Sequence, residues 1–216
     1  MKKGYIFDMD GTLLDSLEAW VDVGNSYLRS IGIKEDPELD SIMKDMSLNE
    51  GGLYMKERYH LSQSVEEIIK GACHIVENKY IYEIQLNVGV QSFLEKCYEQ
   101  GYVMCVLTAS SSKLAKKALK RLGILDYFQD VYSCQTIGYS KKDQRVYLET
   151  MKKLGVHQSE CVVVEDALYA IETAVKAGFH VKAIQNKENQ KDWSKICQIA
   201  DESYESFDEM QVKIES

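Results

Sequence analysis

Two aspartates, Asp8 and Asp10, stand one residue apart in the stretch YIFDMDGTLLDS, which begins at residue 5 with an apolar run. Like charges this close repel each other, so a chain that buries them needs something to offset the repulsion. A second acidic pair, Glu165 and Asp166, follows another apolar run far along the chain. Carboxylates that meet from two strands can hold Mg²⁺, a hard cation that favours oxygen ligands. The sequence therefore predicts a magnesium site built from these acids.

Apolar runs of strand length recur along the chain and are separated by amphipathic helical patterns. We expect strands at 4–7, 102–107, 131–134, 161–164 and 179–184, and helices at 111–122, 144–154 and 167–177. Glycine follows each of these helical patterns as a stop signal. Alternating βα units predict an α/β fold, namely a doubly wound, Rossmann-like parallel sheet with helices on both faces.

The stretch from residue 16 to residue 85 contains no convincing strand and carries helix signals instead. One amphipathic helix is predicted from apolar residues that share a face: Leu17, Trp20, Val21, Tyr27, Leu28 and Ile31. SLNE at 47–50 and SVEE at 64–67 have the spacing of capping boxes. We therefore expect an all-helical cap domain at 16–85, inserted into a core made of residues 1–15 and 86–216.

The acidic residues share a position relative to the predicted strands. In an open parallel sheet, the ligand crevice lies beyond the carboxyl ends of the strands. Asp8 and Asp10 follow the first strand, Thr108 follows the second, and Glu165 and Asp166 follow a later one. We expect all of these side chains to meet at one edge of the sheet.

These residues resemble the motifs of the haloacid dehalogenase superfamily, in its phosphatase branch with a helical cap. DMDGTLLDS matches the pattern DxDGTLxDS without a gap, and three further motifs follow in order: VLTAS with Thr108, GYSKKDQRVYLE with Lys141, and VVVEDALYAIETAVKAG with Glu165 and Asp166. The resemblance spans nearly the whole chain and covers relatives such as β-phosphoglucomutase and phosphoglycolate phosphatase. It implies a phosphoric monoester hydrolase.

The resemblance also implies a role for both residues of the first acidic pair. Asp8 would attack phosphorus in line and form an aspartyl-phosphate. Asp10 would give a proton to the leaving oxygen and then take one from the hydrolytic water. Both would bind Mg²⁺, Asp8 through its carboxylate and Asp10 through its backbone carbonyl.

The remaining motifs supply the phosphate-binding and metal-binding groups that the resemblance implies. Thr108 and Lys141 would bind the transferring phosphoryl oxygens, helped by backbone N–H groups around Ala109 and Ser110. Asp166 would ligate Mg²⁺ directly, with Glu165 either joining it or orienting its neighbours.

Two positions depart from the family pattern without removing a catalytic group. Gln144 stands where the pattern has Pro, and Ala167 stands where it has Ser, so that a supporting hydrogen bond would be lost. Ser16 is expected to be a helix cap, whereas Ser110 is either a cap or a phosphate ligand.

Three functions remain open. The leading one is a Mg²⁺-dependent phosphatase for a small phosphorylated metabolite. A phosphosugar mutase is a second, but related mutases carry His where this chain has Trp20, which favours hydrolysis. A binding protein that keeps the fold without catalysis is the third. Asp10 argues against a dehalogenase, because dehalogenases lack the second Asp of the motif.

Substrate specificity would depend on cap residues. The sequence does not decide which of these candidates faces the site: Trp20, Asn49, Glu50, Tyr54 and Lys56.

The amino-acid composition limits the classes of binding partner that this chain can have. The chain has 26 Lys and Arg against 34 Asp and Glu, a formal charge of −8, and lacks a basic cluster, which disfavours nucleic-acid and membrane partners. No apolar segment approaches the roughly 18 residues of a membrane span, and no signal peptide is evident. We expect a cytoplasmic monomer.

The six cysteines lack CxxC pairs and are interpreted as small buried hydrophobic residues.

Overall fold

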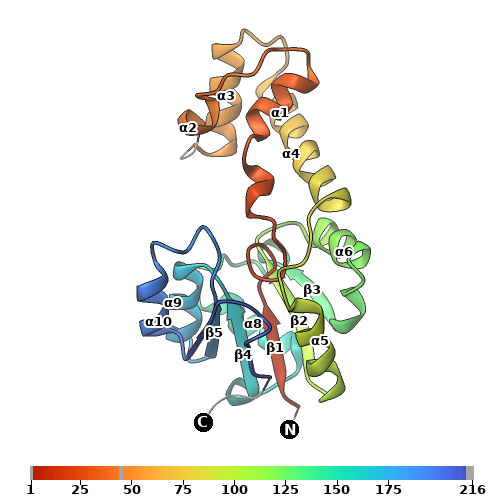
Figure 1. Cartoon of the computed structure of the whole chain (residues 1–216), viewed down its shortest axis with the longest axis vertical. Coiled ribbons are helices and arrows are strands. Elements are labelled where there is room, and N and C mark those ends of the chain that lie inside the picture. The colour runs from red at the N-terminus through yellow and green to blue at the C-terminus, as the bar shows by residue number, and fades with distance from the viewer. Residues whose placement is uncertain (1, 44–45, 213–216) are drawn as a thin grey trace. The chain divides into compact units, whose positions relative to one another are not determined.

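The computed structural model describes residues 2–43 and 46–212 and divides the chain into two compact units (Figure 1). One, here called the core unit, comprises residues 1–16 and 85–216, and the other, the helical unit, comprises Leu17–Ile84. The assignment of 16–85 to an independent cap domain stays a prediction, because compactness alone does not show that a segment folds by itself.

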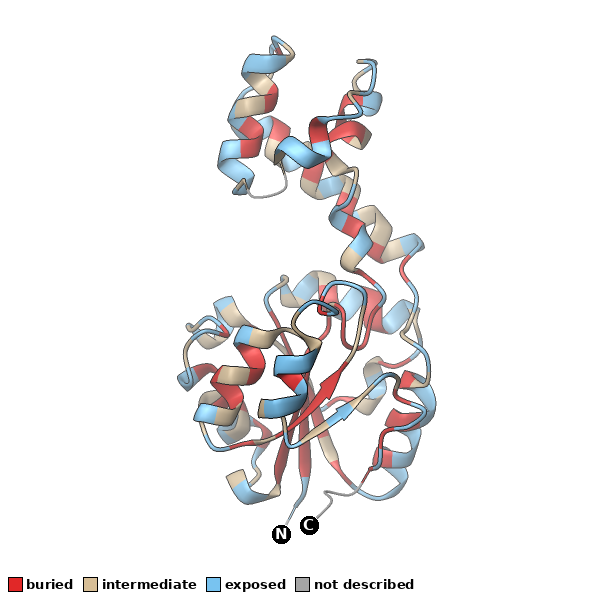
Figure 2. Ribbon diagram, turned by 60° about the vertical axis from the view of Figure 1, so that its left-hand side comes forward, coloured by how far each residue is buried: buried red, intermediate tan, exposed pale blue. Residues whose placement is uncertain are grey.

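The core unit is built on a six-stranded parallel sheet in the order β3-β2-β1-β4-β5-β6. The strands are β1 (Gly4–Phe7), β2 (Val103–Thr108), β3 (Asp130–Ser133), β4 (Cys161–Glu165), β5 (His180–Ile184) and β6 (Glu202–Tyr204). Figure 2 shows the central strands as buried, as expected for a parallel sheet covered on both faces. The predicted doubly wound fold is confirmed. The sequence prediction missed β6, a three-residue strand without an apolar run.

Helices cover the sheet, and some of them begin or end at a capping residue. They are α5 (Val90–Glu99), α6 (Ser112–Arg121), α7 (Cys134–Ile137), α8 (Arg145–Leu154), α9 (Leu168–Lys176) and α10 (Trp193–Ile199). The Ser111 side chain caps α6 by accepting the Leu114 N–H at 3.2 Å. Gly155 ends α8 in the left-handed conformation, with φ of 74°. Two short 3₁₀ turns, η2 (Leu125–Tyr127) and η3 (Gln158–Glu160), precede β3 and β4.

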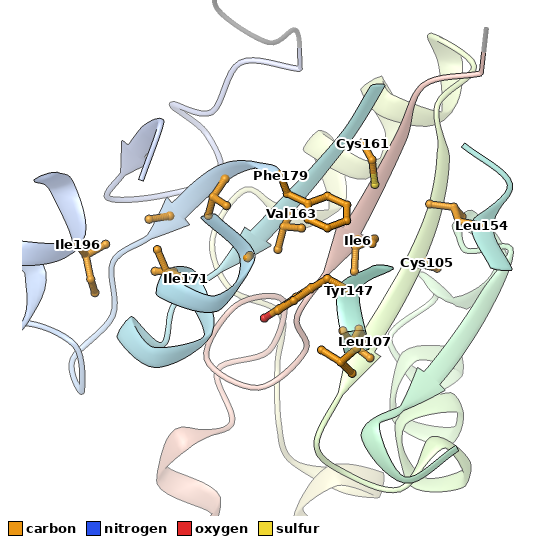
Figure 3. Close-up of a cluster of buried hydrophobic side chains, with 14 residues drawn as sticks. Ile6, Cys105, Leu107, Tyr147, Leu154, Cys161, Val163, Ile171, Phe179 and Ile196 are labelled. Carbon is orange, nitrogen blue, oxygen red and sulfur yellow. The ribbon is translucent and has the colours of Figure 1, made fainter. Parts of the chain in front are cut away.

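Successive side chains of β1 point to opposite faces of the sheet and pack into a different apolar core on each face. Ile6 packs with residues of β2, β4, β5 and the helices α8, α9 and α10, in the apolar cluster drawn in Figure 3. Tyr5 and Phe7 point to the opposite face, where both rings contact Phe93 of α5. Because both faces of β1 are packed with bulky side chains, the loop that follows β1 starts from a fixed position.

The helical unit contains the 3₁₀ turn η1 (Leu17–Trp20) and helices α1 (Val23–Ser30), α2 (Leu39–Met43), α3 (Leu48–Arg58) and α4 (Val65–Tyr82). Its apolar core includes Tyr27, Leu28, Leu39, Met55, Leu61 and Ile68. Both predicted capping boxes are confirmed, at the starts of α3 and α4. The prediction of one helix through residues 17–31 is wrong, because Asp22 adopts a left-handed conformation, with φ of 59°, and separates η1 from α1.

Among the described residues, no helix combines the length and the apolar character needed to cross a bilayer.

Candidate active site

Asp8 and the Glu165–Asp166 pair meet because β1 and β4 are neighbours in register. Phe7 pairs with Val164, and the Asp8 N–H donates to the Val164 carbonyl at 2.9 Å. The carboxylates of Asp8, Glu165 and Asp166 are buried, and one oxygen of each lies within 4.8 Å of the others. The strand ends therefore gather three acids in one place, as predicted from the sequence.

Lys141 is the cation that faces this cluster. It lies between α7 and α8, is only 5% exposed, and donates to Asp8 Oδ1 and, at 2.5 Å, to Glu165 Oε1. Burial lowers the pKa of Lys141, but the carboxylates of Asp8 and Glu165 outweigh burial and raise that pKa well above its usual range. Lys141 therefore stays charged and bridges two acids.

Glu165 is held from several directions at once. Its Oε2 accepts the backbone N–H groups of Asp166 at 3.0 Å and Ala167 at 3.3 Å. Its Oε1 accepts Lys141 and, at 3.4 Å, the Tyr147 hydroxyl. Glu165 thus supports Lys141 and is also one of the three clustered acids, and the choice between its two predicted roles, metal ligand or orienting group, stays open.

Asp166 is bound by neutral donors. Thr12 Oγ1 donates to its Oδ1 at 3.0 Å, and Asn186 Nδ2 donates to its Oδ2 at 2.6 Å. Burial and the neighbouring Glu165 carboxylate raise the pKa of Asp166 to about 7, against the opposing effect of the Asn186 and Thr12 hydrogen bonds and the Lys141 charge. Near neutral pH this carboxyl is thus poised between its protonated and charged forms.

Asp10 is surrounded by hydroxyl groups. Its Oδ1 accepts Ser16 Oγ at 2.7 Å, and its Oδ2 accepts Ser110 Oγ at 2.9 Å and Thr108 Oγ1 at 3.4 Å. The Ser16 hydroxyl donates to Asp10, and η1 begins at the next residue, so the expectation that Ser16 caps a helix stays a prediction. Ser110 is not the cap of α6, a position that Ser111 holds.

The acidic cluster fits a hard divalent cation. Burial raises the pKa of Asp8. The positive charge of Lys141 lowers this pKa, but the negative charges of Glu165, Asp166 and Asp10 raise it further. Lys141 can neutralise one of the three clustered carboxylates, so ionisation of all three would leave the cluster with a net negative charge. A buried negative charge with oxygen ligands is the environment that Mg²⁺ prefers.

The structure brings most of the predicted site residues together at one edge of the sheet and adds others. Hydrogen bonds connect Asp8, Lys141, Glu165 and Asp166 in one group, and Asp10, Thr108 and Ser110 in another. Ala109 lies between Thr108 and Ser110 and is exposed. The residues that the sequence analysis did not assign to the site are Thr12, Ser16, Tyr147, Asn186 and Asn189. Thr12, Ser16 and Tyr147 lie inside the motifs quoted in the sequence analysis, and Asn186 follows the end of β5 by two residues.

Two of the specificity candidates have structural partners within the helical unit. Glu50 closes the capping box with Ser47, and Lys56 donates to the carbonyls of Leu61 and Gln63. Asn49 begins the NEGG segment, which lies inside α3 and is therefore part of a helix, not a loop. Trp20, in η1, is 45% exposed. Tyr54 packs against the apolar core of the helical unit.

Both the sequence and the fold of this chain are similar to those of known proteins. A model of the family described as haloacid dehalogenase-like hydrolase matches residues 5–184. Hexitol phosphatase B of Escherichia coli (strain K12) is 28% identical over 216 residues, covering 96% of this chain and 94% of that protein. A Thermotoga maritima crystal structure assigned as a beta-phosphoglucomutase has a TM-score of 0.84 at 22% identity and covers 96% of both chains. The magnesium-bound crystal structure of YfnB from Bacillus subtilis has a TM-score of 0.75 at 16% identity and covers 97% of both chains.

The raised pKa of Asp166 makes a prediction about stability. In the folded chain this carboxyl holds its proton up to a pKa of about 7, whereas its ordinary value is 3.8. Its contribution to stability is therefore complete below pH 3.8 and is lost as the pH rises through 7. Asp166→Asn removes this titration, so the variant should gain stability over the wild type as pH rises from about 4 to about 7, by on the order of 2–4 kcal/mol.

Urea unfolding in the presence of EDTA, repeated across this pH range, measures the difference. The exposed Asp126→Asn is the matched control and should stay within about 0.5 kcal/mol of the wild type. A wild type that gains stability over Asp166→Asn with rising pH would contradict the assignment.

Proposed function

The chain belongs to the haloacid dehalogenase-like hydrolase family, and from this premise we propose that it hydrolyses the phosphate monoester of a small metabolite through an aspartyl-phosphate on Asp8, with Mg²⁺ as cofactor. The observation that carries the proposal is the buried cluster in which Lys141 bridges Asp8 and Glu165 beside Asp166. This cluster combines a nucleophile, a fixed positive charge and a cation site within a few ångströms.

Asp8 is assigned as the nucleophile. Lys141 holds its Oδ1, so Oδ2 is the oxygen assigned to the attack. That oxygen forms a bond to phosphorus while the bond from phosphorus to the leaving oxygen breaks. The nucleophile must be charged at this moment, and the Lys141 ammonium group favours the charged form.

Asp8, Asp166 and the backbone carbonyl of Asp10 are the groups that would hold Mg²⁺. The bound cation would neutralise charge on the phosphoryl oxygens and keep both carboxylates ionised. The YfnB structure, which shares the fold, is bound to magnesium and supports this part of the proposal.

Asp10 is assigned as the general acid and base. Its carboxyl would give a proton to the leaving oxygen in the first step. In the second step it would accept a proton from the water that attacks phosphorus, which frees Asp8 and releases inorganic phosphate. The hydroxyls of Ser16, Ser110 and Thr108 fix the orientation of this carboxyl, so that the same group can serve both steps.

Thr108 and Lys141 are assigned to the transferring phosphoryl group, together with the backbone N–H groups of Ala109 and Ser110. The Ser110 N–H donates to Thr108 Oγ1 at 2.9 Å, so it would exchange this acceptor for a phosphoryl oxygen when substrate binds. Donors directed at the transferring oxygens would stabilise the charge that develops there.

The proposed substrate is a phosphorylated sugar or sugar alcohol. Hexitol phosphatase B is a relative over nearly the full length of both proteins, and its name places it in this substrate class. The fold is also that of a protein assigned as a beta-phosphoglucomutase. A mutase returns the phosphoryl group to the sugar, and Trp20, where related mutases carry His, favours transfer to water instead.

Product analysis separates these two outcomes. The wild-type protein is incubated with Mg²⁺ and a hexose 1-phosphate or a hexitol phosphate, and phosphorus is followed by NMR. Inorganic phosphate should be the main product. Accumulation of hexose 6-phosphate with little free phosphate would show that the protein is a mutase and not a phosphatase. If no member of a panel of sugar phosphates gave either product, both assignments would be rejected.

Removal of the nucleophile gives a second prediction. Asp8→Asn keeps the size of the side chain but removes the attacking charge, so turnover should fall by at least about 10³-fold. Circular dichroism should show an intact fold. The exposed Asp126→Asn serves as the matched control and should keep wild-type turnover, whereas normal turnover in a sequence-verified Asp8→Asn sample would refute the covalent step.

Exchange of the metal gives a further prediction. Exhaustive treatment with EDTA should abolish turnover, and added Mg²⁺ should restore it. Added Ca²⁺ should restore it poorly, because its longer and looser coordination misplaces the nucleophile. Initial rates across a titration of each cation measure this, and full activity in the chelated protein would eliminate the proposed cofactor.

A further inference from the structure

Asn186 connects the ends of three neighbouring strands. It lies two residues beyond β5, and its side-chain amide donates to Asp166 Oδ2 at 2.6 Å and to the Gly11 carbonyl at 3.2 Å. Asp166 directly follows β4, and Gly11 belongs to the loop after β1. Since β1, β4 and β5 are adjacent in the sheet, this one amide links the loops that carry the proposed nucleophile and the proposed metal ligand.

The orientation of this amide is fixed by the turn that contains it. Asn186 Oδ1 accepts the backbone N–H groups of Glu188 and Asn189, both at 3.0 Å. An amide nitrogen placed there would face two donors, so the NH₂ group must point to Asp166 and Gly11. The direction of the hydrogen bond to Asp166 therefore follows from the surrounding backbone.

Asn189 stabilises the same turn but does not touch the Asp166 carboxylate. Its Oδ1 accepts the Asn186 N–H at 3.0 Å, and its Nδ2 donates to the carbonyls of Asp166 and Ile184, both at 2.9 Å. Asn189 thus acts on the backbone, whereas Asn186 acts on the carboxylate. This difference offers a control within one turn.

The two donors to Asp166 orient its carboxylate without neutralising it. Thr12 binds one oxygen and Asn186 binds the other, so the plane of the group is fixed from both sides. Each oxygen keeps a further lone pair with which it can ligate a cation. A lysine in place of Asn186 would orient the group equally well but would compete with the cation.

We propose that Asn186 is a positioning residue for the metal site, which holds the Asp166 carboxylate in the orientation that binds Mg²⁺. The inference rests on the proposed function, since it takes Asp166 to be a metal ligand. Outer hydrogen-bond partners of metal ligands typically contribute 10–100-fold in metal affinity. Asn186 should contribute within that range.

The experiment compares four full-length proteins: the wild type, Asn186→Ser, Asn189→Ala and Glu188→Ala. Serine keeps an oxygen that can accept the N–H groups of the turn, but its shorter side chain withdraws the donor from Asp166. Glu188 is exposed and contributes only its backbone N–H to Asn186, so Glu188→Ala is the neutral control. Asn186→Ala is a further variant should the serine variant fold poorly.

Binding is measured directly with Mn²⁺, by following the EPR signal of the free ion, and thermal unfolding of the metal-free proteins reports stability. Initial rates give the Mg²⁺ concentration for half-maximal activity and the substrate KM at saturating Mg²⁺. Asn186→Ser should weaken Mn²⁺ binding and raise the half-maximal Mg²⁺ concentration by about 10–100-fold. The substrate KM at saturating metal should change by less than about threefold, because the variant loses metal orientation and not substrate contacts.

The outcomes separate the inference from the proposed function. A wild type that binds no Mn²⁺ would reject the metal role of the cluster and the inference with it. A wild type that binds Mn²⁺, beside an Asn186→Ser variant that binds it equally well, would reject the inference alone. The third outcome is that Asn189→Ala and Asn186→Ser lose similar stability and weaken Mn²⁺ binding equally. In that case the turn as a whole positions Asp166, and the specific role of Asn186 is also rejected.

Discussion

The architecture of the site depends on one buried ion-pair arrangement, in which the single ammonium group of Lys141 lies against Asp8 and Glu165 while Asp166 adds a third carboxylate. Removing charges from water costs several kcal/mol for each ion, and this cost is recovered only when the partners are close and well hydrogen-bonded. With one ammonium group against three acids among the described residues, full ionisation would leave an excess of negative charge, and burial together with this excess raises the pKa of Asp8 and of Asp166. Under the proposed function, a bound Mg²⁺ would offset the excess.

Packing and strand register hold the elements that carry these charges in place. Tyr5 and Phe7 pack on one face of β1 and Ile6 on the other, so the chain reaches Asp8 without freedom to move away from β4. Glu165 is anchored by the N–H groups of the two residues that follow it, at the point where β4 turns toward α9. Lys141 is buried and reaches both acids, and the Tyr147 hydroxyl donates to the same oxygen of Glu165 that accepts Lys141. The electrostatic arrangement is thus a consequence of strand register and packing.

The sequence predicted those parts of the site that follow from strand ends and motif spacing. Asp8, Asp10, Thr108 and the Glu165–Asp166 pair all follow apolar runs, and parallel strands bring such ends together. Residues whose role depends on the path of a loop could not be found in this way. The hydrogen bond from Ser16 to Asp10 depends on the path of the loop after β1. The left-handed conformation at Asp22 breaks a helix that the apolar pattern made continuous.

Asn186 illustrates why the second layer of a site is harder to predict than the first. Carboxylates that bind a cation must be of one chemical type and lie at strand ends, whereas a donor that orients them can come from any loop within reach. The family pattern places a hydroxyl-bearing Ser after the acidic pair, and Ala167 cannot donate from its side chain. In this chain the donors to the Asp166 carboxylate come from two loops, Thr12 from the loop after β1 and Asn186 from the turn after β5, 20 positions beyond Asp166 in sequence. Because a buried carboxylate without hydrogen-bond partners is costly, segments far apart in sequence must come together to support this one group.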